Sequence, residues 1–153
     1  GKAVLTFLNR SADLKTGDRA IDFSLPDIKG NLINLQSFRN KYVLLEFWAS
    51  WCGPCRQDNR DLLKLYRKYR NDGFEILGVT LDKQKSVWES TVLSDTMLWT
   101  TVSDLKGDFG DVPIMYRVYG LPSNYLIDPQ GIIIDIDLRG TALSDKLETI
   151  FKN

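Results

Sequence analysis

The sequence contains no histidine, only two cysteines, no excess of either charge and no long apolar run. Without histidine, Cys-His nucleophilic catalysis and a histidine proton shuttle are excluded for this sequence. Twenty Lys and Arg balance twenty Asp and Glu, so no overall field attracts nucleic acid or an anionic membrane. One basic cluster, residues 64–70, suits the negative end of a helix, and we expect no nucleic-acid partner. No stretch approaches the roughly 18 apolar residues of a membrane span.

Size and composition favour one globular domain. A chain of 153 residues of which 43% are hydrophobic is long enough to bury a substantial core. We expect residues 17–153 to form this domain as a monomer. Residues 1–16 are expected to be an extension or linker, in which residues 4–8 fit either a strand or the end of a helix. The chain begins with Gly and shows no secretory signal, so we expect that a signal, an anchor or a domain precedes it.

The middle of the chain has the pattern of a β-α-β unit. Residues 42–48 form a nearly continuous apolar run of strand length, which is typical of a strand buried on both faces. A helical pattern follows from about residues 52–54 to Gly73, a residue suited to the position just after a helix. Residues 74–80 predict a second buried strand. Two such strands joined by a helix imply a right-handed parallel crossover.

The flanking segments predict the remaining elements. Two short apolar runs around the turn at residues 27–31 indicate an N-terminal β-hairpin. A strand at 123–127 is followed by a turn and a partner strand at 132–138, and an amphipathic helix closes the chain. The insert at residues 82–118 predicts a short helix, a strand at 98–102 and a helical turn at 114–119. The expected fold class is therefore α/β, with a central mixed β-sheet flanked by helices, an N-terminal hairpin and a central insert.

Cys52 and Cys55 lie between the predicted strand and the predicted helix. Such a dithiol can close into a disulfide and reopen without movement of the fold. A nucleophilic thiol must be a thiolate, yet an ordinary cysteine with a pKa of about 8.5 is only about 3% ionised at pH 7. At the start of a helix the sulfur of Cys52 should lie near unpaired backbone N–H groups, including that of Cys55. The helix dipole alone is a marginal cause of a lowered thiol pKa, and hydrogen bonds from these groups should supply much of the rest. We therefore assign Cys52 as the attacking thiol and Cys55 as the resolving thiol.

Gly53 and Pro54 between the cysteines fit this chemistry. Pro54 suits the first helical turn, where its missing N–H has no partner, and Gly53 lets a substrate backbone pass close. Three other interpretations of the pair remain open: half a zinc site, a purely structural disulfide, and an inactive domain that retains both cysteines. Zinc requires four ligands, so we expect no metal and no cofactor besides the Cys52–Cys55 disulfide. A disulfide across so short a loop constrains little of the unfolded chain, which argues against a purely structural role.

Glu46 interrupts the first buried strand six positions before Cys52, where a charge is costly without a partner. One interpretation places this residue at a sheet edge, where it is simply solvated. The other is a buried carboxyl whose pKa is raised by desolvation, so that it can move a proton to or from Cys55. On the second interpretation, Glu46 is the third catalytic residue.

Residues 42–55 (YVLLEFWASWCGPC) closely resemble the thioredoxin superfamily. Residues 17–25 before a hairpin (GDRAIDFSL) and residues 120–131 (GLPSNYLIDPQG) are similar to TlpA/ResA-type oxidoreductases in particular. The resemblance covers residues 17 to about 150. It implies a thioredoxin-like fold, an acidic residue at position 46 that transfers protons, and an enzyme that exchanges disulfides with protein substrates.

The resemblance implies several further features. Pro122 should follow a cis peptide bond and face the dithiol, with Leu121 offering backbone groups to an extended substrate, whereas Leu121-Pro122 by itself favours an ordinary turn. Residues 82–118 should shape the substrate groove. Members of this family usually work outside the cytoplasm, often tethered to a membrane, and many reduce apocytochrome c or other exported proteins. We therefore expect a periplasmic or membrane-anchored reductant that receives electrons from a membrane or soluble thiol donor.

Two side chains near the dithiol carry further expectations. Asp58 occupies the position, three residues after the second cysteine, where relatives in the cytochrome-maturation group have glutamate. It either tunes the redox couple or is a solvated acid favoured by the helix dipole. Trp51 is expected to form part of the substrate platform.

Two other functions fit parts of the sequence. A thiol peroxidase of the same fold is one, but such enzymes need Thr or Ser three residues before the reactive cysteine, where this chain has Ala49. The other is a binding module, in which the groove beside Leu121 and Pro122 captures extended peptides and the dithiol has no function. Trapping of mixed disulfides by Cys55→Ser separates an enzyme from such a module.

Overall fold

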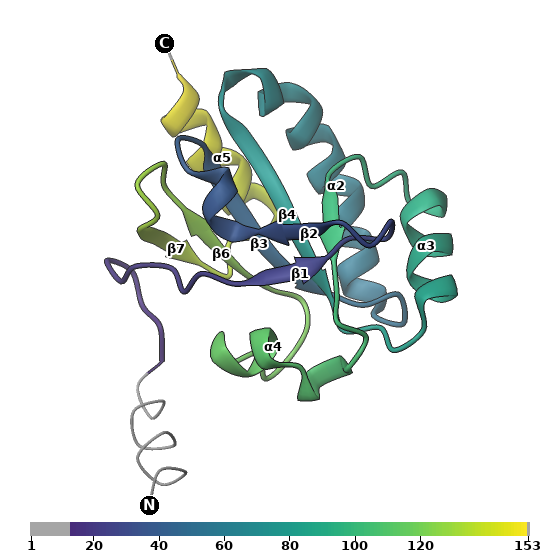
Figure 1. The fold of residues 1–153 in the computed structure, drawn as a ribbon. Helices are drawn as coiled ribbons and strands as arrows, with labels where there is room; N and C mark the ends of the chain where they lie inside the picture. The colour runs from purple at the N-terminus through teal and green to yellow at the C-terminus, as the bar shows by residue number, and fades with distance from the viewer. Residues whose placement is uncertain (1–12, 153) are drawn as a thin grey trace, which may run out of the picture.

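The computed structural model describes residues 13–152, so the prediction for residues 4–8 lies outside the described part. A five-stranded sheet with the order β5-β4-β3-β6-β7 forms the centre of the fold (Figure 1). Strand β3 pairs in parallel with β4 and antiparallel with β6, so the sheet is mixed, as predicted. Its strands are β3 (Tyr42–Trp48), β4 (Phe74–Thr80), β5 (Thr100–Val102), β6 (Ser123–Ile127) and β7 (Ile133–Ile136).

Strands β3 and β4 match the predicted ranges because their apolar runs are buried on both faces. Only Tyr42 in β3 and Glu75 in β4 escape full burial. Apolar side chains on both faces of a strand need cover above and below the sheet, which the elements packed on its two faces provide. In the pairing register, Glu46 of β3 lies between Gly78 of β4 and Asn124 of β6.

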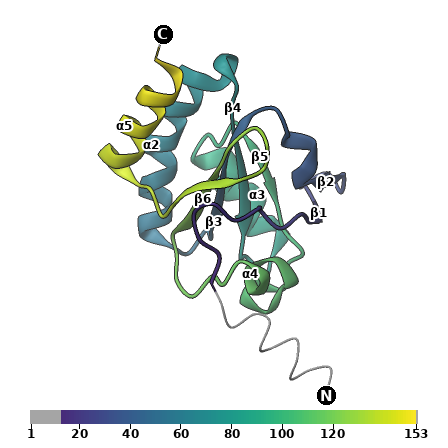
Figure 2. The same cartoon turned by 90° about the vertical axis from the view of Figure 1, so that its left-hand side faces the viewer.

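Different elements cover the two faces of the sheet. Helices α2 and α5 lie side by side on one face, while the separate hairpin β1–β2 lies on the other (Figure 2). Tyr69 of α2 stacks on Phe151 of α5, with ring centroids 5.1 Å apart. None of the helices within residues 13–152 combines the length and the apolar character needed to span a bilayer. The remaining elements are α2 (Gly53–Tyr69), α3 (Lys85–Ser94), α4 (Asp111–Met115), α5 (Gly140–Phe151), β1 (Ser24–Pro26), β2 (Leu32–Asn34) and the 3-10 helices η1 (Leu35–Phe38), η2 (Arg70–Asp72) and η3 (Gly107–Phe109).

The predicted position of the helical turn at 114–119 is wrong, because α4 occupies Asp111–Met115. Pro113 lies in the first turn of this helix, where a missing N–H costs little. The helix ends before Arg117, whose φ of 55° lies in the left-handed region and is incompatible with a continuing right-handed helix.

Two strands are shorter than predicted. Strand β5 begins at Thr100 rather than at residue 98, since Trp99 packs edge-on against Tyr66 of α2 with ring centroids 5.7 Å apart. Strand β7 ends at Ile136 rather than at residue 138, because Asp137 has a φ of 54°.

Candidate active site

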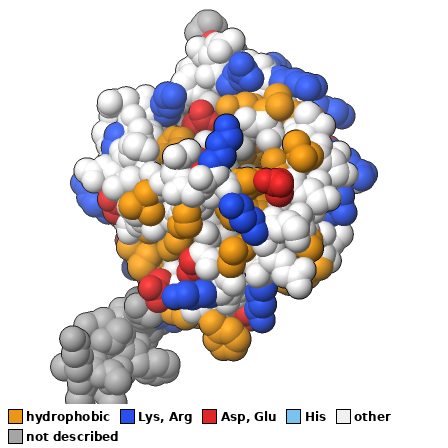
Figure 3. Space-filling view, turned by 45° about the vertical axis from the view of Figure 1, so that its right-hand side comes forward, with side chains coloured by type: hydrophobic (Ala, Val, Ile, Leu, Met, Phe, Trp, Pro, Cys, Tyr) orange, Lys and Arg blue, Asp and Glu red, His pale blue; other side chains and the backbone are white. Residues whose placement is uncertain are grey.

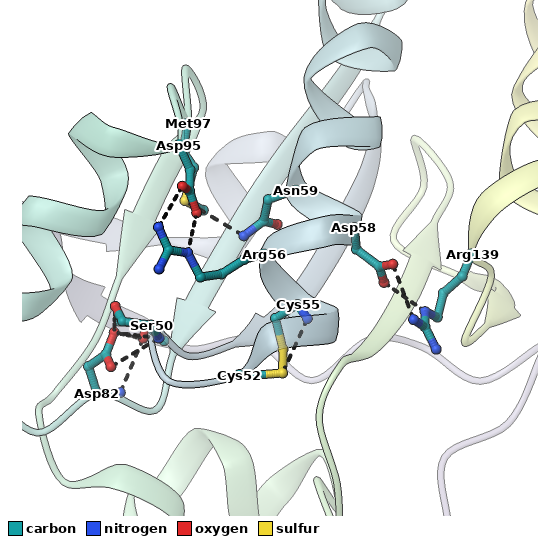
Figure 4. The surroundings of a disulfide bond; sticks show 11 residues. Ser50, Cys52, Cys55, Arg56, Asp58, Asn59, Asp82, Asp95, Met97 and Arg139 are labelled. Atoms are coloured by element: carbon teal, nitrogen blue, oxygen red, sulfur yellow. Dashed lines mark hydrogen bonds and ion pairs between the residues drawn. A yellow bond between two sulfur atoms is a disulfide. The ribbon is translucent and has the colours of Figure 1, made fainter.

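The two cysteines lie at the junction of β3 and α2, as predicted. Cys52 is the N-cap residue of α2, and Pro54 occupies the first turn of the helix. The backbone N–H of Cys55 donates to the sulfur of Cys52 over 3.2 Å (Figure 4), which confirms the expected contact. The two residues form a disulfide with their Cα atoms 5.3 Å apart. The helix start therefore supplies an N–H donor to the sulfur that should become the thiolate.

The two sulfurs differ in access to solvent. Cys52 is 6% exposed to solvent, whereas Cys55 is fully buried. Only Cys52 lines the groove next to the dithiol, which has a volume of about 860 Å³. An incoming disulfide can therefore reach the sulfur of Cys52 but not that of Cys55.

The groove beside Cys52 contains four of the five predicted substrate-binding residues: Trp51, Gly53, Pro54 and Leu121. Trp51 is 71% exposed and Tyr119, another groove residue, is 80% exposed, so two aromatic rings are presented to solvent near the reactive sulfur. The insert contributes part of the lining, as the resemblance implies, through residues 82–84, Val87, Asp108 and Val118. On the face shown in Figure 3, hydrophobic side chains (orange) are interspersed with basic (blue) and acidic (red) ones.

The peptide bond between Leu121 and Pro122 is cis, in agreement with the expectation from the resemblance and against an ordinary turn. Leu121 lines the groove, whereas Pro122 lines a second, smaller cavity together with Glu46. The cis-proline loop therefore lies between the site where a substrate would approach and the buried acid.

Glu46 is buried in the centre of the sheet, with 2% of its surface exposed. The interpretation that placed it at a solvated sheet edge is wrong, because β3 has a neighbouring strand on each side. Burial, and secondarily the negative charge of Asp58, raises the pKa of Glu46 from 4.5 to about 8. A carboxyl with such a pKa can both take up and release a proton near neutral pH.

The smaller cavity has a volume of about 20 Å³, which is enough for about one water molecule. Asp58 and Arg139 lie at this cavity, and their side chains form a double hydrogen bond of 2.7 and 3.2 Å (Figure 4). The Asp58 side chain is only 16% exposed. The interpretation of Asp58 as a solvated acid is therefore wrong: it is an ion-paired group in the wall of the cavity that holds Glu46.

Sequence reasoning did not identify Asp82 as part of this site. Asp82 is 2% exposed and lines the groove with Cys52. Its carboxylate accepts hydrogen bonds from the backbone N–H of Ser50 (3.1 Å), the hydroxyl of Ser50 (2.7 Å) and the hydroxyl of Thr80 (2.6 Å). The contact ties the end of β4 to the turn that precedes Cys52 (Figure 4). Its only sequence signal was an acid two residues after a buried strand.

Asn59 and Arg139 were also missed. Asn59 is fully buried on α2, four residues after Cys55 and therefore on the same helix face. Arg139 is the N-cap residue of α5. Within residues 13–152, no group of three or more Cys, Asp or Glu side chains is arranged to hold a metal ion.

The sequence of the chain is similar to those of known proteins. The model of the AhpC/TSA family matches residues 16–136. The thiol-disulfide oxidoreductase ResA of Bacillus cereus is 30% identical over 146 residues, which are 95% of this chain and 82% of that protein. The thioredoxin-like protein YneN of Bacillus subtilis is 33% identical over 146 residues, covering 94% of this chain and 82% of YneN.

Solved structures share the fold as well. The thioredoxin domain of a thiol-disulfide oxidoreductase from Bacteroides vulgatus has a TM-score of 0.85 and 36% identity, covering 92% of this chain and 100% of that domain. A thiol-disulfide oxidoreductase from Bacteroides fragilis has a TM-score of 0.81 and 38% identity, covering 87% of this chain and 99% of that one. The fold, the disulfide at the start of α2 and these matches agree that the chain belongs to the AhpC/TSA family, as a ResA-like thiol-disulfide oxidoreductase with a thioredoxin-like fold.

Proposed function

We propose that this protein reduces disulfides in other proteins outside the cytoplasm, with Cys52 as the attacking thiol and Cys55 as the resolving thiol. The observation that carries this proposal is the unequal access of the two sulfurs. Cys52 opens onto a groove of about 860 Å³, and Cys55 lies fully buried behind it. Such an arrangement lets one thiol meet the substrate and reserves the other for release.

In the first step, the Cys52 thiolate attacks one sulfur of a substrate disulfide. The substrate S–S bond breaks as a new bond forms to Cys52, and the leaving sulfur takes the electron pair and then a proton. The N–H of Cys55, 3.2 Å from the Cys52 sulfur, stabilises the thiolate before the attack. The product is a mixed disulfide between Cys52 and the substrate.

In the second step, Cys55 loses its proton to the carboxylate of Glu46 and attacks the sulfur of Cys52. The bond between Cys52 and the substrate breaks, and the second substrate sulfur leaves with the electron pair and is protonated. Two electrons and two protons have then passed to the substrate, and the Cys52–Cys55 disulfide remains. With its pKa raised to about 8, Glu46 is a base strong enough for a buried thiol. A thiol reductant, soluble or membrane-bound, must reduce the disulfide before the next cycle.

The groove suits an extended polypeptide. Leu121, before the cis bond, lines the groove, and we propose that its backbone groups pair with an extended chain. Trp51, which also lines the groove, supplies a large exposed apolar surface. The extracytoplasmic location, and exported proteins such as apocytochrome c as substrates, are proposed from the resemblance to TlpA/ResA-type proteins.

Asp58 is proposed to tune this chemistry through Glu46. Its charge helps to raise the pKa of Glu46, and its ion pair with Arg139 limits that effect because the guanidinium offsets the negative charge. Asp58 is thus a positioning and tuning residue rather than one that touches the reacting sulfurs.

Reduction of insulin by the purified, prereduced protein tests the function. Wild type should reduce insulin disulfides and lose two thiols itself. Cys52→Ser should abolish turnover, while Cys55→Ser should accumulate a mixed disulfide that reductant releases. Turnover that persists in Cys52→Ser would refute the assignment. Consumption of peroxide in place of insulin reduction would favour the peroxidase, and an absence of trapped mixed disulfides would favour the binding module.

A further inference from the structure

The side chain of Asn59 is a buried polar neighbour of Glu46 whose amide can turn to suit the charge of the carboxyl. The amide group lies between the Glu46 carboxyl and the sulfur of Met97, and its end toward Met97 is 3.7 Å from that sulfur (Figure 4). With Nδ2 at the end toward Glu46, it donates to both oxygens of an ionised carboxylate, the longer contact being 3.1 Å to Oε1. With Oδ1 at that end, the amide can only accept a proton from Glu46, and Nδ2 faces Met97. Both orientations occupy the same volume.

The two orientations match the two protonation states of a carboxyl group. An ionised carboxylate only accepts hydrogen bonds, so it requires the amide nitrogen. A protonated carboxyl carries one O–H donor, which the amide oxygen can accept. Met97 is then a weak acceptor for the amide nitrogen that has turned away. A buried amide between a carboxyl and a thioether can therefore remain hydrogen-bonded whether or not Glu46 holds its proton.

Three other polar side chains near Glu46 already have hydrogen-bond or ion-pair partners. Asn124 of β6 donates to the carbonyl of Leu138 over 2.8 Å and accepts from its N–H over 3.1 Å. Asp58 and Arg139 are paired with each other. Asp61, which also lines the cavity, would repel a carboxylate. Asn124, Asp58 and Arg139 are held by these bonds, and an ionised Asp61 has no donor to offer a carboxylate.

We propose that Asn59 is a positioning residue that follows the proton of Glu46, donating to the carboxylate and accepting from the carboxylic acid. This inference rests on the proposed role of Glu46 as the proton acceptor for Cys55. When Cys55 transfers its proton to Glu46, the amide of Asn59 turns by half a revolution. The turn lets Glu46 change charge in a buried site without leaving an unpaired polar group, which would otherwise add to the barrier.

Asn59→Leu tests this inference because leucine has a similar shape and no polar atom. In the oxidised protein, the infrared carbonyl band of the protonated acid, identified by its loss in Glu46→Gln, reports the titration of Glu46. Asn59→Leu should move the midpoint upward by about one to two pH units, since the ionised form loses its charge-assisted donor. Turnover of insulin at pH 7 should fall roughly tenfold, and this effect should vanish in a Glu46→Gln background.

Met97→Leu is the matched control. It keeps the volume and removes only the weak acceptor, so the midpoint should stay within a few tenths of a unit of the wild-type value. Asn59→Ala serves the same purpose as Asn59→Leu should the latter fail to fold. An unchanged midpoint in the Asn59 variant, or an equal loss of rate in the Glu46→Gln background, would overturn the inference. Wild type that cannot reduce insulin would instead overturn the proposed function, because the infrared titration does not depend on turnover.

Discussion

Replacement of Glu46 by Gln should remove most of the pH dependence of stability between pH 5 and pH 9. Below pH 4.5 the acid holds its proton in both the folded and the unfolded chain. Between that value and about 8, the pKa of Glu46 in the folded protein, only the folded state holds it. Unfolding then releases a proton, and the free energy of unfolding falls as pH rises. The stabilisation by the protonated acid is fully present below pH 4.5 and lost above pH 8.

The size of the effect follows from the rise in pKa. A rise from 4.5 to about 8, at about 1.4 kcal/mol per unit, gives a loss of about 5 kcal/mol across this window. That is a large share of the roughly 5–15 kcal/mol that stabilises a typical domain. Glutamine has almost the same shape and no charge. Relative to wild type, Glu46→Gln should therefore gain stability as pH rises.

Urea unfolding of the oxidised protein at pH 5, 7 and 9 measures this difference. The oxidised form is required because cysteines in a disulfide do not titrate, which leaves the acid as the group of interest. Glu75→Gln on the neighbouring strand β4 is the control, since it also removes one carboxyl, from a half-buried position. It should keep the pH dependence of wild type. If the free energies of wild type and Glu46→Gln ran parallel from pH 5 to pH 9, the argument for a protonated acid in the core would fail.

Two further substitutions test the surroundings of the dithiol. Asp82→Ala should lower the free energy of unfolding by about 1–3 kcal/mol, because it leaves the buried hydroxyl of Thr80 and the partly buried N–H of Ser50 without their acceptor. It should also slow insulin reduction, whereas a rate equal to wild type would show that the turn before the dithiol needs no anchor. Arg139→Gln should raise the pKa of Glu46 further by leaving Asp58 unpaired, and the additional change Asp58→Asn should reverse that shift in the infrared titration. If the titration midpoint of Glu46 were the same in wild type and in both variants, Asp58 would be excluded as a tuning residue.

The central elements could be predicted because their determinants are local. Strands β3 and β4 are continuous apolar runs whose ends coincide with the ends of the hydrophobic pattern. Helix α2 begins at a cap residue followed by proline and gives way to η2 before Gly73, which has a φ of 103°. The position of α4 could not be predicted in the same way, because it depends on a left-handed conformation at Arg117, a residue with no intrinsic preference for that region.

In the candidate site too, residues in local motifs could be predicted from the sequence, whereas their distant partners could not. The cysteines, Glu46 and the Leu121-Pro122 bond are recognisable from short motifs. Their partners are not, because each contact joins residues far apart in sequence. Asp82 lies 32 residues from Ser50, and Arg139 lies 81 residues from Asp58. The functional meaning of these side chains arises only when the sheet brings the ends of its strands together.

The stability that the protein loses when the buried Glu46 ionises indicates that this residue serves the reaction. A leucine at this position in β3 would fit the apolar run, whereas a carboxyl that ionises there loses stability with every unit of pH above its ordinary range. Such a cost is typical of residues that serve a reaction rather than the fold. The surroundings of Glu46 limit this cost without removing it: in our inference Asn59 is a partner for either protonation state, and Arg139 is ion-paired with the nearby Asp58. If the acid were only a tolerated defect, replacing it by glutamine would improve stability at pH 9 and leave insulin reduction intact. Loss of turnover together with a gain of stability is the outcome that requires a catalytic role.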